Sequence, residues 1–391
     1  MWSRSGMMGT TMIPDNVTNI TSYRQEEQDT WDTAILVMKA VVMTTIMAAA
    51  VTGNLIVIIS VMKFQKLRDS KTNQFIVSLA FADFLVAFLV MPFNASQEIS
   101  GKWIFGREMC DIFNSNDVLF STASILHLCC ISVDRYIAII HPLQYDRKMS
   151  TFRALLMLAL TWIASILISY IPIQLQFYTT EEHYTLLEEN PELCIFQVNK
   201  IYAVVSSSIS FWIPCTIMIF LYMRIYFAAR RQEKHIRSNS ICSHERTGNS
   251  EALLNTTRNS REFSDRRKMK REHKAAKTLG IIMGAFVMCY LPFFSWYVST
   301  TMCGSGCPYP RVLGSILFWI GYFNSCLNPV IYAYYNREFR TAFKRLLHIH
   351  SHTTKRRLSL LKNNTTSKPN GTDRHIHLVY LQKNEDSPQL L

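Results

Sequence analysis

One acidic residue, Asp117, lies within a long apolar stretch, seven residues after Cys110. An ionised carboxylate in such surroundings needs a cation as a partner. The alternative, an ion pair with a protein lysine or arginine, is weak because the second to the seventh of the chain's apolar stretches hold no basic residue near this depth. Val118, Phe293, Phe294 and Tyr297 instead suit a protonated amine, through charge pairing and contact with aromatic rings. Asp117 is therefore predicted to bind the cationic group of a ligand.

Three serines, Ser206, Ser207 and Ser210, come shortly before Pro214 in another apolar stretch. On a helix, the spacing of three and four residues lets Ser206 or Ser207 share a face with Ser210. Their hydroxyls could bind a phenol or catechol hydroxyl; alternatively, they bond to their own backbone or assist helix packing. Together with Asp117, they predict a site with a cationic end and a hydroxyl end, which fits a small aryl-ethylamine.

Two further charged positions interrupt apolar stretches. Asp83 is a carboxylate in the middle of one of them, with oxygen partners available from neighbouring stretches. Arg135 can pair with Asp134 or with Glu272. This pair is either a static neutralisation of charge or a contact whose release lets a helix move. The predicted partners of Asp83 are Ser124, Asn324, Ser325 and Asn328.

Seven apolar stretches must position these side chains. Of the 391 residues, 49% are hydrophobic and only 18% are charged. A bilayer core needs about 20 apolar residues per helix, and unpaired backbone is prohibitively costly in hydrocarbon. We therefore expect an all-α membrane protein with a seven-helix bundle. The predicted spans are 34–62, 72–93, 108–140, 152–174, 200–227, 275–299 and 312–335.

Basic residues predict the orientation of the bundle. The segments 224–277 and 336–391 hold 26 of the 41 lysines and arginines, whereas the connection 175–199 holds none. Basic segments remain on the cytoplasmic side of a membrane, so the amino terminus is expected outside. The net charge of +13 is then explained by this topology and by attraction to anionic lipid, and not by nucleic-acid binding. Residues 1–33 are expected to form an extracellular tail without a signal peptide, glycosylated at Asn16 and Asn19.

Four of the ten cysteines are expected on the outer side. Cys110 begins the third span and Cys194 lies in the acidic outer connection. A disulfide between them would tie this connection across the mouth of the bundle. Cys303 and Cys307 flank Gly-Ser-Gly and would close a small ring. The other six are interpreted as small buried hydrophobic residues.

Polar motifs then resemble those of a known family, one motif per span. They are Gly53-Asn54, Leu79-Ala80-Phe81-Ala82-Asp83, Asp134-Arg135-Tyr136, Trp162, Pro214 with Tyr222, Cys289-Tyr290-Leu291-Pro292 and Asn328-Pro329-Val330-Ile331-Tyr332. In this order, they resemble the rhodopsin-like G-protein-coupled receptors over residues 34–345. A retinal-based pump is excluded because the seventh span has no lysine. A transporter is disfavoured by the odd number of spans and the lack of inverted repeats.

This resemblance implies roles for several residues. It implies that Asp83 binds sodium, the only metal expected, and that Tyr322 hydrogen-bonds Asp117. It also implies no cofactor and no enzymatic activity. The expected partners are a small amine, a heterotrimeric G protein, a receptor kinase, arrestin and membrane lipids. The residues implied in the G-protein switch are Asp134, Arg135, Tyr136, Tyr222, Glu272, Asn328, Pro329 and Tyr332.

Within the amine group, the sequence is most similar to invertebrate β-adrenergic-like octopamine receptors, through 117–136, 198–214, 231–234 and 318–334. Serotonin, tyramine and catecholamine receptors remain alternatives. The resemblance implies stimulatory coupling and a rise in cyclic AMP. Two features depart from the family: Tyr290 replaces a tryptophan, and no cysteine follows the seventh span. We further expect an amphipathic helix at 336–348 and disorder in 228–271 and 349–391.

Overall fold

The computed structural model describes residues 15–244, 252–306 and 310–347. Only the backbone is described at 15–29, 229, 232–244, 252–276, 305 and 311. The described residues form helices joined by short connections and contain no strand. The bundle lies in the unit Met1–Phe343; of the second unit, Lys344–Leu391, only residues 344–347 are described.

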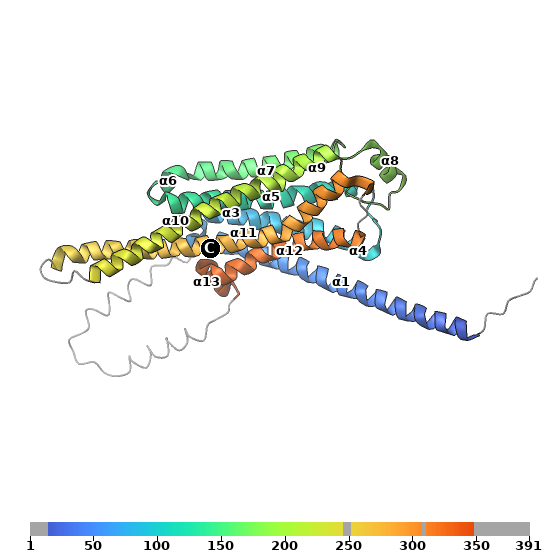
Figure 1. Cartoon of the computed structure of the whole chain (residues 1–391), viewed down its shortest axis with the longest axis horizontal. Coiled ribbons are helices and arrows are strands. Elements are labelled where there is room, and N and C mark those ends of the chain that lie inside the picture. The colour runs from blue at the N-terminus through green and yellow to red at the C-terminus, as the bar shows by residue number, and fades with distance from the viewer. Residues whose placement is uncertain (1–14, 245–251, 307–309, 348–391) are drawn as a thin grey trace, which may run out of the picture. The chain divides into compact units, whose positions relative to one another are not determined.

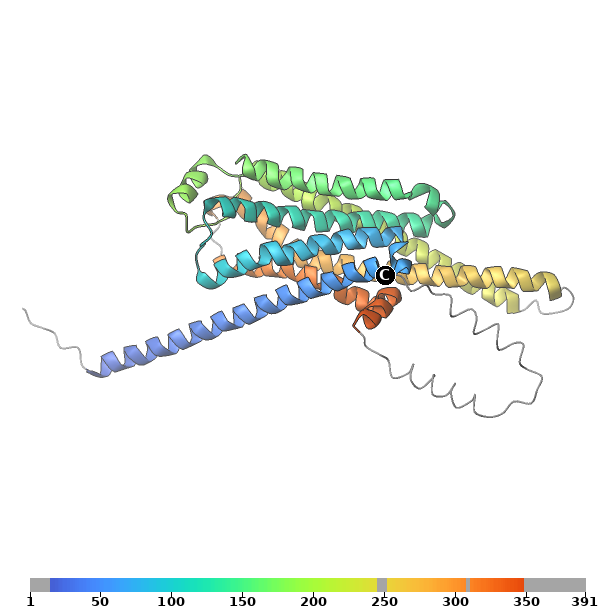
Figure 2. The same ribbon diagram turned by 180° about the vertical axis from the view of Figure 1, so that it is seen from behind.

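Seven helical segments are long and apolar enough to cross a membrane, which confirms the predicted bundle. They are Thr30–Lys63, Lys71–Ser100, Arg107–Ile140, Thr151–Gln174, Lys200–Ala228, Lys277–Cys303 and Val312–Tyr335. The third segment is the structural centre, because its helix α5 (Arg107–Ile140) packs against α3 (Lys71–Leu85), α7 (Thr151–Gln174) and α10 (Ile213–His244) (Figure 1). Figure 2 shows the same helices from behind.

The remaining elements complete or connect these spans. The first, sixth and seventh spans belong to α1 (Asp15–Lys63), α11 (Ala252–Cys303) and α12 (Arg311–Tyr335). The second and fifth are completed by η1 (Val86–Val90) with α4 (Met91–Ser100), and by α9 (Lys200–Ser207) with η3 (Ser208–Trp212). The short elements are α2 (Gln65–Arg68), η2 (Pro142–Gln144), α6 (Tyr145–Lys148), α8 (Glu181–Glu189), η4 (Gly304–Gly306) and α13 (Arg337–Leu346).

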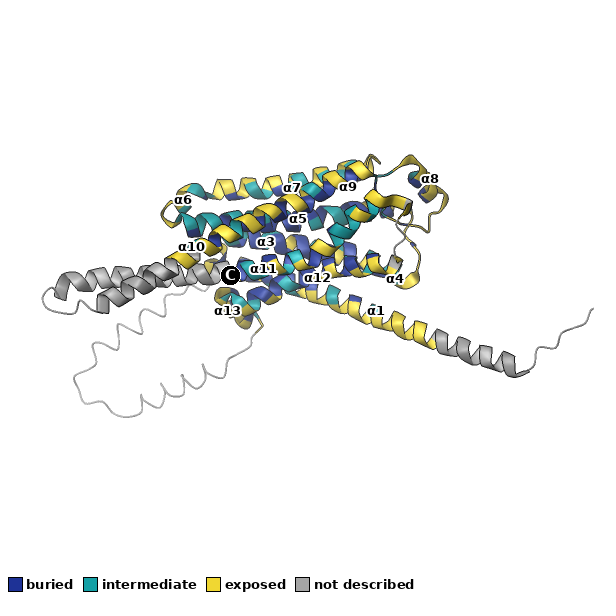
Figure 3. Ribbon diagram, in the orientation of Figure 1, coloured by how far each residue is buried: buried dark blue, intermediate teal, exposed yellow. Residues whose placement is uncertain are grey.

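The helices bury one side and leave large apolar side chains exposed on the other (Figure 3). In α7, Leu156, Leu160 and Leu167 are exposed, whereas Ser165 and Ser169 are buried against the bundle. Each of these two serines donates to the carbonyl four residues earlier, so its hydroxyl is satisfied within the helix. Apolar side chains facing outward are stable in lipid, not in water, which agrees with a membrane location.

Two spans contain a wide helical turn just before a proline. The π-helical turns η1 and η3 precede Pro92 and Pro214, respectively. Proline has no backbone N–H, and its ring crowds the preceding turn, so a wider turn relieves the clash without ending the helix. For this reason the second span continues past its predicted end at 93 to Ser100, where Gly101 with φ 72° terminates it. The wide turn η3 sets the direction of Ser210.

Two other prolines release a carbonyl that a neighbouring helix uses. Pro329 cannot donate to the Ser325 carbonyl four residues earlier, and Asn54 Nδ2 donates to this oxygen at 2.9 Å. Gly53 lets α1 approach closely, since a Cβ at this position would lie 3.0 Å from the Pro329 ring. In the same way, the Tyr202 hydroxyl donates at 3.0 Å to the Ile168 carbonyl that Pro172 leaves free. The prolines thus create bonds between helices.

Helices α10 and α11 continue beyond the membrane spans. The backbone is helical to His244 in α10 and from Ala252 in α11, where disorder was predicted over 228–271. The apolar span has already formed the helix nucleus, so residues such as Lys, Arg and Glu extend it at little cost. Helix α13 buries Phe339, Ala342 and Phe343. The predicted tail at 349–391 lies outside the described residues.

Candidate functional site

A pocket opens among α5, α9, η3, α11 and α12. It brings together most of the side chains that the sequence singled out for a ligand, namely Asp117, Val118, Ser206, Ser210, Phe293, Phe294, Tyr297 and Tyr322. No lysine, arginine or histidine lines it among the described residues. Its other lining residues are Ser121, Thr122, Phe196, Tyr202, Tyr290, Leu317, Phe318 and Gly321.

One end of the pocket carries a carboxylate with a buried oxygen, Asp117 Oδ1, that has no hydrogen-bond partner among the described residues. The Tyr322 hydroxyl lies near this carboxylate, is likewise buried, and makes no hydrogen bond of good geometry there. Phe318 and Phe293 form the adjacent wall, with ring centroids 4.8 Å apart. A protonated amine here would gain a charged hydrogen bond and contact with aromatic faces.

Hydroxyl groups form the opposite end. Thr122 Oγ1 donates to Ser210 Oγ at 2.9 Å, and Ser206 Oγ lies 3.5 Å from the Tyr297 hydroxyl. Ser207 is not part of the pocket, although the sequence left it equivalent to Ser206. The helix turns it away, and its hydroxyl donates to the Val204 carbonyl at 3.3 Å. Of the three serines, Ser206 and Ser210 line the pocket, and a role for Ser207 in binding stays a prediction.

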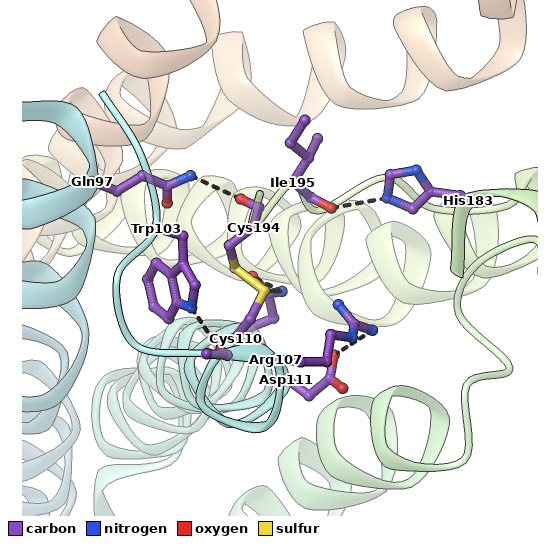
Figure 4. Close-up of a disulfide and its surroundings, with 10 residues drawn as sticks. Gln97, Trp103, Arg107, Cys110, Asp111, His183, Cys194 and Ile195 are labelled. Atoms are coloured by element: carbon purple, nitrogen blue, oxygen red, sulfur yellow. Dashed lines mark hydrogen bonds and ion pairs between the residues drawn. A yellow bond between two sulfur atoms is a disulfide. The ribbon is translucent and has the colours of Figure 1, made fainter. Parts of the chain in front are cut away.

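A disulfide holds the outer connection over the pocket. Cys110 at the top of α5 is bonded to Cys194, 84 residues later, and both are buried (Figure 4). Gln97 Nε2 donates to the Cys194 carbonyl at 2.9 Å, and His183 Nε2 lies 3.1 Å from the Ile195 carbonyl. The next residue, Phe196, stacks on Tyr178 at 5.4 Å and lines the pocket. Sequence reasoning missed Phe196, although its place two residues after Cys194 signals this role.

Beside the disulfide, an ion pair lies at the top of α5. Arg107 and Asp111 are separated by 3.0 Å and are mostly buried. Arg107 also lies over the Tyr184 ring at 5.2 Å, so it joins α5 to α8. Trp103 Nε1 donates to the Gly106 carbonyl at 2.8 Å. The Trp103 backbone N–H also donates to the Glu192 carbonyl at 2.8 Å, so Trp103 and Arg107 both fix the connection that carries Cys194.

Below the pocket, Asp83 is fully buried and accepts three hydrogen bonds. Ser124 and Ser325 donate to Oδ1 at 3.0 and 3.1 Å, and Asn328 donates to Oδ2 at 2.8 Å. Asn324, the residue before Ser325, is also buried. Its Nδ2 has no partner among the described residues and does not reach Asp83. One carboxylate with two hydroxyls is a set of hard oxygen donors, which suits a cation such as sodium.

At the end of α5 opposite the disulfide, Asp134 is fully buried and holds Arg135. Arg135 donates to Asp134 Oδ2 from Nε at 3.0 Å and from a terminal nitrogen at 2.7 Å. Thr72 donates to the same oxygen at 2.7 Å and accepts from Arg135. The Tyr145 hydroxyl of α6 donates to Oδ1 at 2.8 Å. Burial and the neighbouring carboxylate raise the pKa of Tyr145 to about 12, so it remains a donor at physiological pH.

The other predicted switch residues lie at this end or in α12. Tyr222 lies against the backbone of α11, since a Cβ at Gly280 would overlap its hydroxyl. Tyr332 is buried and stacks on Phe339 at 5.3 Å, whereas Tyr136 is partly buried beside Ile139 and Ile225. The Glu272 side chain lies outside the described residues, so its pairing with Arg135 stays a prediction.

Three predicted modification sites fall partly outside the described residues. Cys303 is disulfide-bonded, and Cys307 is not described. The backbone of Asn16 and Asn19 belongs to α1, but their side chains are not described. Glycosylation there stays a prediction.

Sequence reasoning missed a group of pocket residues on α5 and α12. Ser121 follows Asp117 by four residues, so the helical period alone could have placed it on the same face. Gly321 directly precedes Tyr322, but its role could not be predicted because it depends on the distant residue Tyr290. A Cβ at this position would lie 3.3 Å from the Tyr290 ring, so the glycine makes room for Tyr290.

Comparison with known protein families identifies the family to which this helical bundle and its pocket belong. The family described as 7 transmembrane receptor (rhodopsin family) matches residues 53–332. The chain belongs to this family. It is therefore a multi-pass plasma-membrane receptor and not an enzyme, and its partner inside the cell is a G protein.

Individual relatives carry amine-receptor names. The octopamine receptor beta-2R of Chilo suppressalis is 52% identical over 344 residues, which cover 83% of this receptor and 84% of that protein. The octopamine receptor beta-1R of Drosophila melanogaster is 52% identical over 80% of this receptor and 62% of its own length. The D(1B) dopamine receptor of Xenopus laevis is 44% identical over 75% and 66%, respectively.

Proposed function

We propose that this receptor binds octopamine, a phenolic amine, and signals through the stimulatory G protein to raise cyclic AMP. The observation that carries the proposal is the pocket itself: Asp117, which has a buried oxygen without a hydrogen-bond partner, shares an aromatic cavity with the hydroxyls of Ser206 and Ser210. An ammonium group and a ring hydroxyl at the two ends of one small ligand satisfy both. The octopamine receptors among the relatives, at 51 to 52% identity, support the choice of amine.

A catecholamine such as dopamine is the second candidate. Three hydroxyls, of Ser206, Ser210 and Thr122, lie at the ring end, which is enough to receive two adjacent ring hydroxyls. Dopamine receptors at 40 to 44% identity are also among the relatives. Tyramine and serotonin share the ammonium and a ring hydroxyl, so they are outcomes of the test below.

Signal transfer through the bundle forms part of the proposal. The Asp83 cluster would hold a sodium ion, with Asp83, Ser124, Ser325 and Asn328 as its surroundings. Release of Arg135 from Asp134 would open the cytoplasmic end to the G protein, with Tyr222 and Tyr332 following the moving helices. The amino terminus would be extracellular and carry glycans on Asn16 and Asn19. A receptor kinase and arrestin would act on the cytoplasmic serines.

The experiment is a measurement of cyclic AMP in cells that express the chain, with dose series of octopamine, tyramine, dopamine, noradrenaline and serotonin. We expect octopamine to be the most potent agonist and Asp117→Asn to abolish its effect. A response led by dopamine would establish the second candidate instead. No response to any amine, in cells where surface labelling detects the receptor, would refute the coupling, and binding of a labelled amine to the same membranes would test the ligand separately.

A further inference from the structure

The floor of the pocket carries a polar pair that the proposed binding of ammonium and ring hydroxyl does not use. Tyr290 and Ser121 both line the pocket. The Tyr290 hydroxyl lies beside the Ser121 side chain and near the Asp117 carboxylate. Tyr290 is 6% exposed, and its ring is held between Phe286, at 5.0 Å, and Phe294, at 6.3 Å. These contacts restrict the movement of the Tyr290 ring.

The position of this pair along the bundle is set by α5. Ser121 follows Asp117 by four residues and so lies on the same face of α5, about 6 Å deeper in the bundle. The ring-binding hydroxyls come from α9, which carries Ser206, and from η3, which carries Ser210. The pair thus lies beneath the ammonium end and away from the ring end.

The opposite wall at this level is apolar. Phe318 and Leu317 of α12, Val118 of α5 and Phe196 of the outer connection line the pocket above and beside Asp117. Polar groups near the carboxylate are consequently found below it, in Ser121 and Tyr290, and beside it, in Tyr322. A second polar group on a bound amine would be stable on the lower side and poorly solvated on the upper side.

From this asymmetry, we propose that Tyr290 and Ser121 together bind a hydroxyl on the carbon next to the aminomethyl group of the ligand, and so select β-hydroxylated aryl-ethylamines over their deoxy analogues. The inference rests on the proposed function and deepens it. Octopamine carries this β-hydroxyl, and tyramine and dopamine lack it.

The chemistry of the ligand constrains where the β-hydroxyl can lie. The hydroxyl-bearing carbon is bonded directly to the carbon that carries the amine, so an ammonium at Asp117 keeps the hydroxyl at the carboxylate end. The aromatic ring lies between it and Ser206, which excludes the distant serines as partners. This carbon is also a stereocentre. Only one enantiomer directs its hydroxyl down to Tyr290 and Ser121, whereas the other directs it toward the apolar wall, so the pair predicts stereoselective binding.

The test uses four amines that differ by single hydroxyls: octopamine, tyramine, 2-amino-1-phenylethanol and phenethylamine. Their affinities are measured by competition with a labelled amine antagonist on membranes that hold the full chain. The affinity ratio of each β-hydroxylated amine to its deoxy analogue reports the β-hydroxyl alone, because any general loss of binding cancels. We expect Tyr290→Phe, which removes one oxygen, to lower both ratios about 5- to 10-fold and to reduce enantiomer discrimination equally. Ser121→Ala should act in the same direction.

The matched control is Tyr297→Phe, the same substitution at the ring end, where the hydroxyl lies near Ser206. It should leave both β-hydroxyl ratios unchanged. Unchanged ratios in Tyr290→Phe and in Ser121→Ala, on a receptor whose wild type binds octopamine, would overturn this inference and leave the proposed function standing. A loss of the ratio in Tyr322→Phe alone would assign the β-hydroxyl to Tyr322 and likewise overturn it. Failure of all four amines to bind the wild type would overturn the proposed function and this inference together.

Discussion

Replacement of Asp117 by asparagine should separate ligand binding from stability. Asparagine has nearly the same shape as aspartate but no charge. In the free receptor, the carboxylate has an unpaired buried oxygen, and no basic side chain lines the pocket among the described residues. Its charge therefore contributes nothing to folding through an ion pair. We expect Asp117→Asn to unfold at the same temperature as the wild type or higher.

The effect on the amine is large because the pair forms in a partly desolvated pocket. Two unit charges about 4 Å apart at an effective dielectric constant of about 20 interact with roughly 4 kcal/mol. Loss of this interaction corresponds to about a 1,000-fold weaker affinity. The assay is competition by octopamine against a labelled antagonist, with thermal unfolding of the purified receptor measured beside it.

A matched control is Asp111→Asn, six residues earlier on α5. Its carboxylate pairs with Arg107 at 3.0 Å and is not part of the pocket lining. This variant should lower the unfolding temperature and change amine affinity far less than Asp117→Asn. The reasoning is refuted if Asp117→Asn weakens octopamine binding less than 10-fold, or if its affinity and its unfolding temperature fall together as in the control.

Three further sets of variants test individual contacts. Ser206→Ala and Ser210→Ala should each weaken octopamine binding about 5- to 10-fold, while Ser207→Ala, whose hydroxyl bonds to Val204, should leave the measured affinity within about 2-fold. Asn54→Leu leaves the Ser325 carbonyl, which Pro329 cannot reach with an N–H, without a donor and should lower the free energy of unfolding by about 1–3 kcal/mol. This loss should be smaller in a Pro329→Ala background, where a backbone N–H is restored. An equal loss in both backgrounds would contradict the account. Tyr145→Phe removes a donor to the fully buried Asp134 and should destabilise the purified receptor by about 1.5–3 kcal/mol, more than Tyr136→Phe. Because the pKa of Tyr145 is raised to about 12, the stabilisation by its hydroxyl should hold from pH 6 to 9 and be lost only above pH 10. A loss of this stabilisation near neutral pH would disprove the role of Tyr145.

Much of the fold follows from the sequence because a bilayer leaves few choices. A stretch of about 20 apolar residues in hydrocarbon must be helical, so the seven spans can be read from composition alone. The sequence also singled out Asp117, Asp83 and Arg135, since a charge in an apolar stretch is costly and needs a reason. The length of α10 and α11 beyond the spans did not follow from the sequence, because composition does not reveal how far an established helix continues.

The sequence could not decide which side chains meet. Ser206 and Ser207 are adjacent and chemically identical, and only the wide turn before Pro214 and the packing of α9 and η3 place the first in the pocket and turn the second onto its own backbone. The contact between Tyr290 and Ser121 joins positions 169 residues apart in the sequence, on α11 and α5. Local chemistry and the bilayer therefore determine the helices and the costly charges. Tertiary packing decides their partners, because helix rotation and close approach depend on neighbours that no single stretch of sequence contains.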